Sequence, residues 1–209
     1  MDVLVKICGI TSREDAAAAL DAGAGALGFN FYRRSPRYIP PEAAAAITAA
    51  LPPDVCSVGL FADEADPRAV LAVAVAAGVG YLQLHGGEGP TFCRGLGDFP
   101  FIKAFATRPG FDMGVLADYP AQAFLIDAFD SRRVGGTGRL CDWAMARAAK
   151  RYGRVFLAGG LDEHNVGEAV RQVRPYAVDV CSGVESAPGR KDPGRMRRFV
   201  QAARRETKG

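Results

Sequence analysis

Short apolar runs alternate with longer alanine-rich amphipathic runs along the whole chain. Short runs rich in Val, Ile, Leu and Phe are typical of buried strands, and longer amphipathic runs are typical of helices. The apolar runs predict strands at Val3–Ile7, Ala26–Phe29, Ser57–Phe61, Tyr81–Leu84, Phe101–Phe105, Phe124–Asp127, Val155–Ala158 and Val178–Cys181. The amphipathic runs predict helices at Arg13–Ala22, Pro41–Leu51, Pro67–Ala77, Gly89–Gly95, Asp112–Ala117, Asp142–Tyr152, Glu163–Val173 and Pro193–Arg205.

Local signals mark where several of these helices begin and end. Asp66-Pro67 and Asp192-Pro193 each place a capping carboxylate before a proline at the first helical position. Gly78 follows the third helix, where a glycine stop is expected. The run at 112–117 is short and contains Gly114, so a loop is the alternative there.

Eight strand-then-helix units predict an α/β protein with a closed barrel of eight parallel strands, the (β/α)8 TIM barrel. An open, doubly wound sheet usually has about five or six strands, so it fits the count less well. No Pro/Ser-rich linker or low-complexity tract interrupts the pattern. We therefore expect a single domain that spans residues 1–209.

Side chains of a strand alternate between its two faces, which assigns residues to the barrel interior. Leu4, Lys6 and Cys8 share a face, and the opposite, all-aliphatic face of that strand should meet the helices. The same reasoning turns five further polar residues inward: Gln83, His85, Lys103, Asp127 and Asp179. Because the first and last strands are neighbours in a closed barrel, we expect a Lys6–Asp179 ion pair, which we interpret as filling and neutralising the interior.

Composition excludes several classes of function. The net charge is +3, and only the tail from Arg195 to Arg205 is visibly basic, without interleaved aromatic residues, which argues against nucleic-acid binding. No apolar run approaches the roughly 18 residues of a membrane span, and no signal-peptide pattern is present. The five cysteines are widely spaced, which favours neither disulfides nor a metal site and predicts a cytoplasmic protein.

Candidate chemistry gathers where the predicted strands end, at the rim on which barrel enzymes build their active sites. Cys8 ends the first strand before a glycine turn, and Asp127 ends the sixth. If both reach one pocket they form an acid–base pair, with Lys6 or the following helix favouring the thiolate. His85 ends the fourth strand and is either a second candidate base or a hydrogen-bonded liner. We interpret the other four cysteines, Cys56, Cys93, Cys141 and Cys181, as small apolar packing residues.

Two glycine turns follow the seventh and eighth strands. Gly159 and Gly160 form one, and Ser182 and Gly183 form the other. Turns in these places are the usual phosphate cradle of such barrels, although tight turns without a ligand are the alternative. The run Gly135-Gly136-Thr137-Gly138 is either a lid beside Asp127 or a loose connector. Arg37, after the second strand, offers a guanidinium that suits a carboxylate or a phosphate.

These residues, in this order, resemble the phosphoribosylanthranilate isomerase family of tryptophan biosynthesis. The resemblance runs end to end through the blocks Val5-Lys6-Ile7-Cys8-Gly9-Ile10-Thr11, Gly28-Phe29, Ser35-Pro36-Arg37-Tyr38-Ile39, Val58-Gly59-Leu60-Phe61, Leu82-Gln83-Leu84-His85-Gly86, Ile102-Lys103-Ala104, Leu125-Ile126-Asp127, Gly135-Gly136-Thr137-Gly138, Ala158-Gly159-Gly160-Leu161, Val178-Asp179-Val180-Cys181-Ser182-Gly183-Val184-Glu185, Pro188-Gly189 and Lys191-Asp192. Each block alone is weak, but their combined order and spacing are highly specific.

The resemblance implies an Amadori rearrangement of N-(5-phosphoribosyl)anthranilate that needs no cofactor and no metal. It implies that Cys8 is the general base and Asp127 the general acid. It also implies substrate-binding roles, with Arg37 at the anthranilate carboxylate, Gly160, Ser182 and Gly183 at the phosphate, and Gly136 in a covering loop. We add Gln83, His85 and Gly159 to the substrate-binding set. The chain departs from the family pattern at Asn30, at Ala128-Phe129 and at Cys181.

Three other interpretations are open at this point. An indole-glycerol-phosphate synthase would want a lysine acid in the pocket, for which Lys103 is the candidate, and a ribulose-phosphate epimerase would want paired aspartates or a metal set. A barrel that binds a phosphorylated ligand without catalysis is the third. We expect a small phosphorylated substrate as partner, and a monomer or a homodimer.

Overall fold

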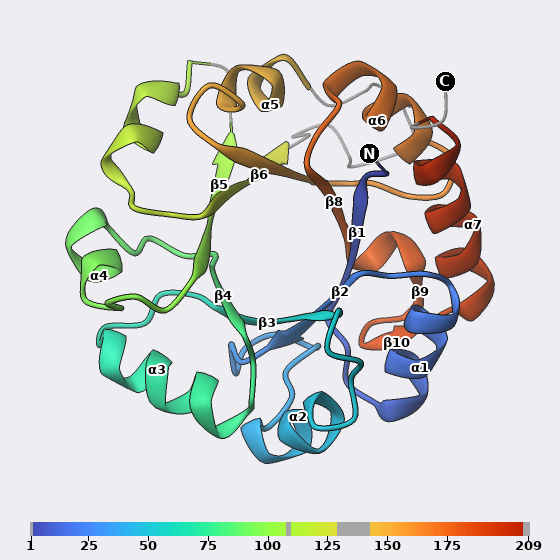
Figure 1. The fold of residues 1–209 in the computed structure, drawn as a ribbon, viewed down its shortest axis with the longest axis horizontal. Coiled ribbons are helices and arrows are strands. Elements are labelled where there is room, and N and C mark those ends of the chain that lie inside the picture. The colour runs from blue at the N-terminus through green and yellow to red at the C-terminus, as the bar shows by residue number, and fades with distance from the viewer. Residues whose placement is uncertain (1, 108–109, 129–142, 207–209) are drawn as a thin grey trace.

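The computed structural model describes residues 2–107, 110–128 and 143–206. Eight parallel strands close into a barrel in which each strand pairs with the next and the last pairs with the first. The strands are β1 (Leu4–Cys8), β2 (Ala26–Asn30), β3 (Cys56–Phe61), β4 (Tyr81–Leu84), β5 (Phe101–Thr107), β6 (Ala123–Ala128), β7 (Arg154–Ala158) and β8 (Ala177–Val180). Figure 1 looks down the barrel, with the strands as an inner ring and the helices around them. The predicted (β/α)8 barrel is confirmed.

The helices that cover the barrel lie close to the predicted ranges. They are α1 (Arg13–Asp21), α2 (Pro41–Thr48), α3 (Pro67–Ala76), α4 (Pro90–Arg94), α5 (Trp143–Ala149), α6 (Val166–Val173) and α7 (Pro193–Arg205). The run predicted at 112–117 is a 3-10 helix, η1 (Met113–Asp118). Asp66 and Asp192 cap α3 and α7 as predicted, by accepting hydrogen bonds from the backbone N–H groups of Arg68 and Arg195.

A small hairpin after β8 was not predicted. A short 3-10 helix, η2 (Ser182–Val184), leads into the antiparallel strands β9 (Glu185–Ala187) and β10 (Arg190–Lys191). Figure 1 places this hairpin beside α1, outside the ring of parallel strands. It returns the chain to the start of α7, so the loop after β8 is an ordered element and not a plain turn.

Two apolar cores hold the barrel. The larger core lies between strands and helices and includes Ile7, Phe29 and Leu157. A smaller one fills the barrel itself, with Val58, Ile102, Ala104, Ala123, Leu125, Phe156, Ala158 and Ala177 packed together. Because successive strand residues face opposite sides, these two sets interleave along β3 and along β5 to β8. The interior side chains on β1 and β6 become polar toward the carboxyl ends of the strands. Reactive groups therefore lie at the mouth of the barrel where the strands end.

The prediction that Lys103 points into the barrel is wrong. Its neighbours Ile102 and Ala104 belong to the interior cluster, so Lys103 faces the helices. There its Nζ donates hydrogen bonds to the carbonyl oxygens of Leu84 at 3.3 Å and Gly86 at 2.7 Å, and it lies 3.3 Å from Glu88 Oε2. These acceptors satisfy a buried ammonium group outside the barrel, and they remove the lysine that the synthase interpretation needed.

Candidate active site

A cavity of about 530 Å³ opens at the carboxyl ends of the strands. Its size is typical of a site for a small organic ligand. It is lined by Cys8, Asn30, Tyr32, Ser35, Arg37, Leu60, Ala62, Gln83, His85, Asp127, Ala158, Gly159, Gly160, Leu161, Asp179, Val180, Cys181, Ser182 and Gly183. The structure therefore brings together every predicted site residue that it describes, whereas Gly136 lies outside the described residues.

Cys8 ends β1 with its side chain inside the barrel mouth, 4% exposed. Its partner on β2 is Gly28. A Cβ at Gly28 would lie 2.8 Å from Cys8 Sγ and 3.1 Å from Lys6 Nζ. A side chain here would displace one of the two groups, so glycine at this position leaves the room in which the sulfur and the ammonium group meet.

Lys6 and Asp179 form the interior ion pair that strand alternation predicts. Lys6 Nζ donates to Asp179 Oδ1 at 2.7 Å, and both side chains are buried. Burial alone would lower the pKa of Lys6, but the charges of Asp179 and Cys8 and the hydrogen bonds to both together outweigh burial, and the pKa is raised. Burial raises the pKa of Asp179, an effect that the charge of Lys6 reverses only in part. Lys6 is therefore a permanent cation beside Cys8.

The surroundings of Cys8 favour its thiolate. The pKa of Cys8 is lowered well below its ordinary value, first by a hydrogen bond with Cys181 and then, against the opposing effect of burial, by the charges of Lys6 and Lys191. A thiolate is the nucleophilic and basic form of cysteine. Position at the strand end, which singled out this residue in the sequence, thus coincides with an electrostatic environment suited to a base.

The interpretation of Cys181 as an inert packing residue is wrong. Cys181 is half-buried and lines the cavity, and its Sγ lies 3.8 Å from Lys191 Nζ. Its pKa is raised, first by the hydrogen bond with Cys8 and then by burial. Cys93 is buried as expected, Cys56 is half-buried, and Cys141 lies outside the described residues. The sequence held a signal for the Cys8–Cys181 contact that was not used, because each cysteine lies two residues beyond its member of the Lys6–Asp179 pair across the closure of the barrel.

Asp127 ends β6 and faces the cavity with about a third of its side chain exposed. His85 Nε2 lies 3.6 Å from Asp127 Oδ2. On the other side of the ring, His85 Nδ1 lies 2.8 Å from Gln83 Nε2. With the Gln83 amide as donor, Nδ1 accepts and Nε2 carries the proton that faces Asp127. The inward direction predicted for Gln83, His85 and Asp127 is confirmed.

The two glycine turns line the same cavity. Gly159 and Gly160 have φ values of +88° and +65°, in the left-handed region that disfavours other residues. At Gly183, a Cβ would collide with the carbonyl oxygen of Leu161. Both turns therefore depend on glycine for their shape, and Ser182 joins them at the start of η2.

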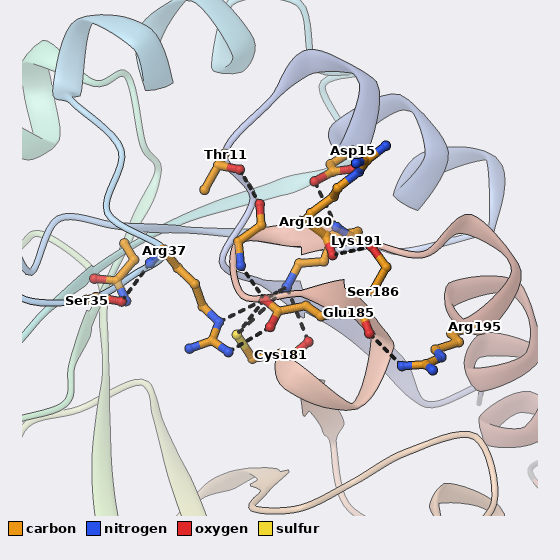
Figure 2. A network of polar contacts seen from close by, with 12 residues as sticks. Thr11, Asp15, Ser35, Arg37, Cys181, Glu185, Ser186, Arg190, Lys191 and Arg195 are labelled. Atoms are coloured by element: carbon orange, nitrogen blue, oxygen red, sulfur yellow. Dashed lines mark hydrogen bonds and ion pairs between the residues drawn. The ribbon is translucent and has the colours of Figure 1, made fainter.

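Arg37 belongs to a charged network that sequence analysis did not find (Figure 2). Its Nε and Nη2 donate to Glu185 Oε1 and Oε2 at 2.8 and 2.7 Å, and Lys191 Nζ donates to Oε1 at 2.9 Å. Burial would raise the pKa of Glu185, but the hydrogen bonds from Arg37 and Lys191 lower it. The hydrogen bond to Glu185 in turn raises the pKa of Arg37. Two cations around one carboxylate leave this network with a net positive charge.

Asn30 supports the loop that carries Arg37. Its Oδ1 accepts from the Tyr32 backbone N–H at 2.9 Å, and its Nδ2 donates to Ser35 Oγ at 3.1 Å. Ser35 Oγ also accepts from the Arg37 backbone N–H at 3.1 Å. Across residues 2–107, 110–128 and 143–206, no group of three or more His, Cys, Asp or Glu side chains is arranged to hold a metal ion.

A thiolate and a carboxyl group that face one cavity beside two glycine turns define a (β/α)8-barrel enzyme for a small phosphorylated substrate. The model of the N-(5'-phosphoribosyl)anthranilate (PRA) isomerase family matches residues 5–202. The chain belongs to this family, and it is an isomerase.

Individual relatives agree over nearly the full length. An N-(5'-phosphoribosyl)anthranilate isomerase from Citrifermentans bemidjiense is 52% identical and aligns over 96% of this chain and 97% of its own. The crystal structure of the phosphoribosyl anthranilate isomerase from Thermotoga maritima has a TM-score of 0.87 at 41% identity and covers 96% of this chain and 98% of that one. A further structure, with a TM-score of 0.85 at 39% identity and the same coverage, contains reduced 1-(o-carboxyphenylamino)-1-deoxyribulose 5-phosphate.

Proposed function

We propose that this chain catalyses the Amadori rearrangement of N-(5-phosphoribosyl)anthranilate to 1-(2-carboxyphenylamino)-1-deoxyribulose 5-phosphate, the third step from chorismate to tryptophan. Cys8 acts as the general base and Asp127 as the general acid. The observation that carries the proposal is that these two groups, from β1 and β6, line one cavity together with the glycine turns after β7 and β8. The relative with a bound reduced product analogue supports the choice of substrate.

The reaction moves protons and one carbon–oxygen bond. Asp127 gives a proton to the ribose ring oxygen, the bond from C1′ to that oxygen breaks, and a protonated Schiff base forms. The Cys8 thiolate then takes the proton from C2′, and the electron pair forms the C1′–C2′ double bond of an enolamine. In the ketonisation, the proton on Cys8 goes to C1′, while the C2′ hydroxyl gives its proton back to Asp127 and becomes a ketone. The sum is an isomerisation, so acid–base catalysis suffices.

The remaining predicted residues that the structure describes contact the substrate or orient the acid in this scheme. The turns with Gly159, Gly160, Ser182 and Gly183 take the phosphate. The Glu185 carboxylate engages Nε and Nη2 of Arg37, so we assign Nη1 to the carboxylate of the anthranilate ring.

His85 and Gln83 lie on the Asp127 side of the cavity. His85 is close enough to Asp127 to orient its carboxyl group. Gln83 Oε1 is buried, and it has no hydrogen-bond partner within the described part of the chain. We assign this oxygen to a ribose hydroxyl, because a substrate donor would satisfy it.

Turnover of the anthranilate substrate tests the proposal. We expect Cys8→Ala and Asp127→Asn each to lower kcat by about 10²–10⁴-fold, the usual contribution of a general base or acid, while the fold survives. Cys56→Ala is the matched control, because Cys56 lines a pocket with Leu4 and Ala26 at the opposite end of the strands. A Cys8→Ala variant with the kcat of the wild type would refute the mechanism. Arg37→Ala should raise KM strongly, and an unchanged KM would remove its assigned role.

The described residues contain no helix long and apolar enough to cross a membrane. The cytoplasmic location, the single domain over residues 1–209 and the choice between monomer and homodimer stay predictions from the sequence.

A further inference from the structure

The contact between Cys8 and Cys181 forms where the barrel closes. In the parallel pairing of β1 with β8, Ile7 lies opposite Val180, and the next residue in each segment is a cysteine: Cys8 ends β1, and Cys181 lies just beyond the end of β8. Both cysteines line the cavity. A Cβ on Gly9, the residue after Cys8, would lie 3.0 Å from Cys181 Sγ, so this sulfur sits against the backbone that carries Cys8.

We propose that Cys181 is a positioning residue for the reaction: its thiol donates a hydrogen bond to the Cys8 sulfur and holds that sulfur as a thiolate facing the substrate. The proposal rests on the proposed function only in taking Cys8 as the base. It assigns a role to a side chain that the sequence analysis interpreted as apolar packing.

The charged groups around Cys8 come from several elements. Lys6 on β1, Arg37 after β2 and Lys191 on β10 are cations, and Asp179 on β8 opposes them. Asp127 faces the same cavity from β6. Lys6 and Arg37 are already bound to carboxylates, at 2.7 Å from Asp179 and from Glu185. The Cys181 thiol is a neutral donor beside the sulfur, and it adds no charge that would compete for the substrate's anionic groups.

The Cys181 thiol has one hydrogen and two acceptors within reach. Glu185 Oε1 lies 3.8 Å from Cys181 Sγ. That oxygen already accepts from Arg37 Nε at 2.8 Å, from Lys191 Nζ at 2.9 Å and from the Gly189 backbone N–H at 3.4 Å. A carboxylate oxygen with three donors gains little from a fourth, weak one, whereas a thiolate beside Cys181 gains a directed bond.

At most one of the two sulfurs is ionised at neutral pH, because two adjacent thiolates would repel each other. Lys6 decides which one, since its ammonium group meets Cys8 Sγ beside Gly28. The pKa of Cys8 is correspondingly lowered and that of Cys181 raised. The pair titrates as a unit, in which Cys8 gives up the first proton and Cys181 keeps its own.

The first test follows alkylation of Cys8 in the full chain under a phosphine reductant, with the rate at each cysteine resolved by peptide mass spectrometry over a range of pH. A hydrogen bond to an ionised group stabilises it enough that its loss in Cys181→Ala should raise the Cys8 midpoint by about one pH unit. Cys181→Ser keeps a donor and should stay near the wild type. Cys56→Ala is the matched control and should not shift the midpoint.

The second readout is the pH profile of kcat/KM. In Cys181→Ala the acidic limb of this profile should move to higher pH by the same amount as the alkylation midpoint. Above that limb, kcat/KM should recover. A merely structural defect would lower kcat at every pH. An unshifted Cys8 midpoint in Cys181→Ala overturns the proposal, and so does a shifted midpoint with an unmoved kinetic limb.

The wild type alone provides a test that needs no variant. Cys8 should be alkylated well before Cys181 at neutral pH, and equal or reversed rates overturn the proposal even if Cys181→Ala fails to fold. Failure of the proposed function would appear differently, as absent turnover in the wild type or as a Cys8→Ala variant with full kcat. Neither result changes what alkylation reports about the two sulfurs.

Discussion

Replacement of Lys6 by methionine tests the ion pair inside the barrel. Methionine fills a similar volume but leaves Asp179, only 8% exposed, without its counter-charge. Two unit charges 2.7 Å apart attract by about 6 kcal/mol at an effective dielectric constant of about 20. Much of this attraction only offsets the cost of burial, and removing one partner of a buried pair typically costs about 3–5 kcal/mol. We expect Lys6→Met to lose about that much stability at neutral pH.

The loss should depend on pH with a definite sign. Burial already raises the pKa of Asp179 in the native protein, and the variant removes the cation that restrains this shift. A carboxyl group whose pKa is higher in the folded than in the unfolded state destabilises the fold as pH rises between the two values. The deficit of Lys6→Met should therefore shrink as the pH falls below the folded pKa and Asp179 takes up a proton.

Urea unfolding at neutral and at acidic pH measures both effects. The double variant Lys6→Met/Asp179→Leu removes both charges and should recover most of the loss, to within about 1–2 kcal/mol of the wild type. Arg171→Met is the matched control, because it breaks an exposed pair with Glu168 and should cost less than about 1 kcal/mol. A single variant as stable as this control, or a double variant no better than the single one, would refute the reasoning.

Three further predictions concern the site. Gly28→Ala should lower kcat at least about tenfold, because its Cβ would lie 2.8 Å from Cys8 Sγ, and an unchanged kcat in a folded variant contradicts this. Gly183→Ala should raise KM for the phosphorylated substrate by about tenfold or more, because the new Cβ would collide with the Leu161 carbonyl oxygen. A KM equal to that of the wild type would contradict this prediction. The pKa of Glu185 is lower in the folded protein than in the unfolded chain. The ionised carboxylate therefore stabilises the fold above the unfolded pKa of about 4.3, and this stabilisation is lost as the pH falls through the folded pKa. Glu185→Gln should flatten that part of the urea stability profile, and a superimposable profile would contradict the sign.

Much of the fold and of the site could be predicted from the local periodicity of the sequence and from the rule that the barrel closes. The alternation along β1 placed Cys8 and Lys6 on the interior face, and the adjacency of the first and last strands then paired Lys6 with Asp179. Both inferences need only the two-residue period of a strand and the rule that eight parallel strands close. Asp127 entered the same cavity because all parallel strands end at the same mouth.

Other features depend on contacts that no local pattern encodes. Lys103 shares its face with Phe101 and Phe105, but Ile102 and Ala104 on the opposite face are equally apolar, so alternation alone did not fix its direction. The acceptors that make its burial tolerable are the carbonyls of Leu84, at the end of β4, and Gly86, together with the Glu88 carboxylate in the following loop. The β9–β10 hairpin could not be predicted either, because its strands are too short to show an alternation of apolar and polar residues. Glu185 therefore had no assigned role until the fold placed it beside Arg37.

The hairpin also ties down the segment that follows Cys8, the proposed base. Thr11 Oγ1, just after β1, donates to the Gly189 carbonyl at 2.6 Å, and the Lys191 backbone N–H donates to Asp15 Oδ2 at 3.1 Å. The turn that follows Cys8 is thus tied to the hairpin that carries Glu185 and, through Arg37, to the loop after β2.

The charges of this assembly then determine the state of the base. Three cations, Lys6, Arg37 and Lys191, surround two carboxylates, Asp179 and Glu185. One positive charge is left over, and it favours a thiolate at Cys8. Such surroundings suit the proposed base at neutral pH, where an isolated thiol would be mostly protonated.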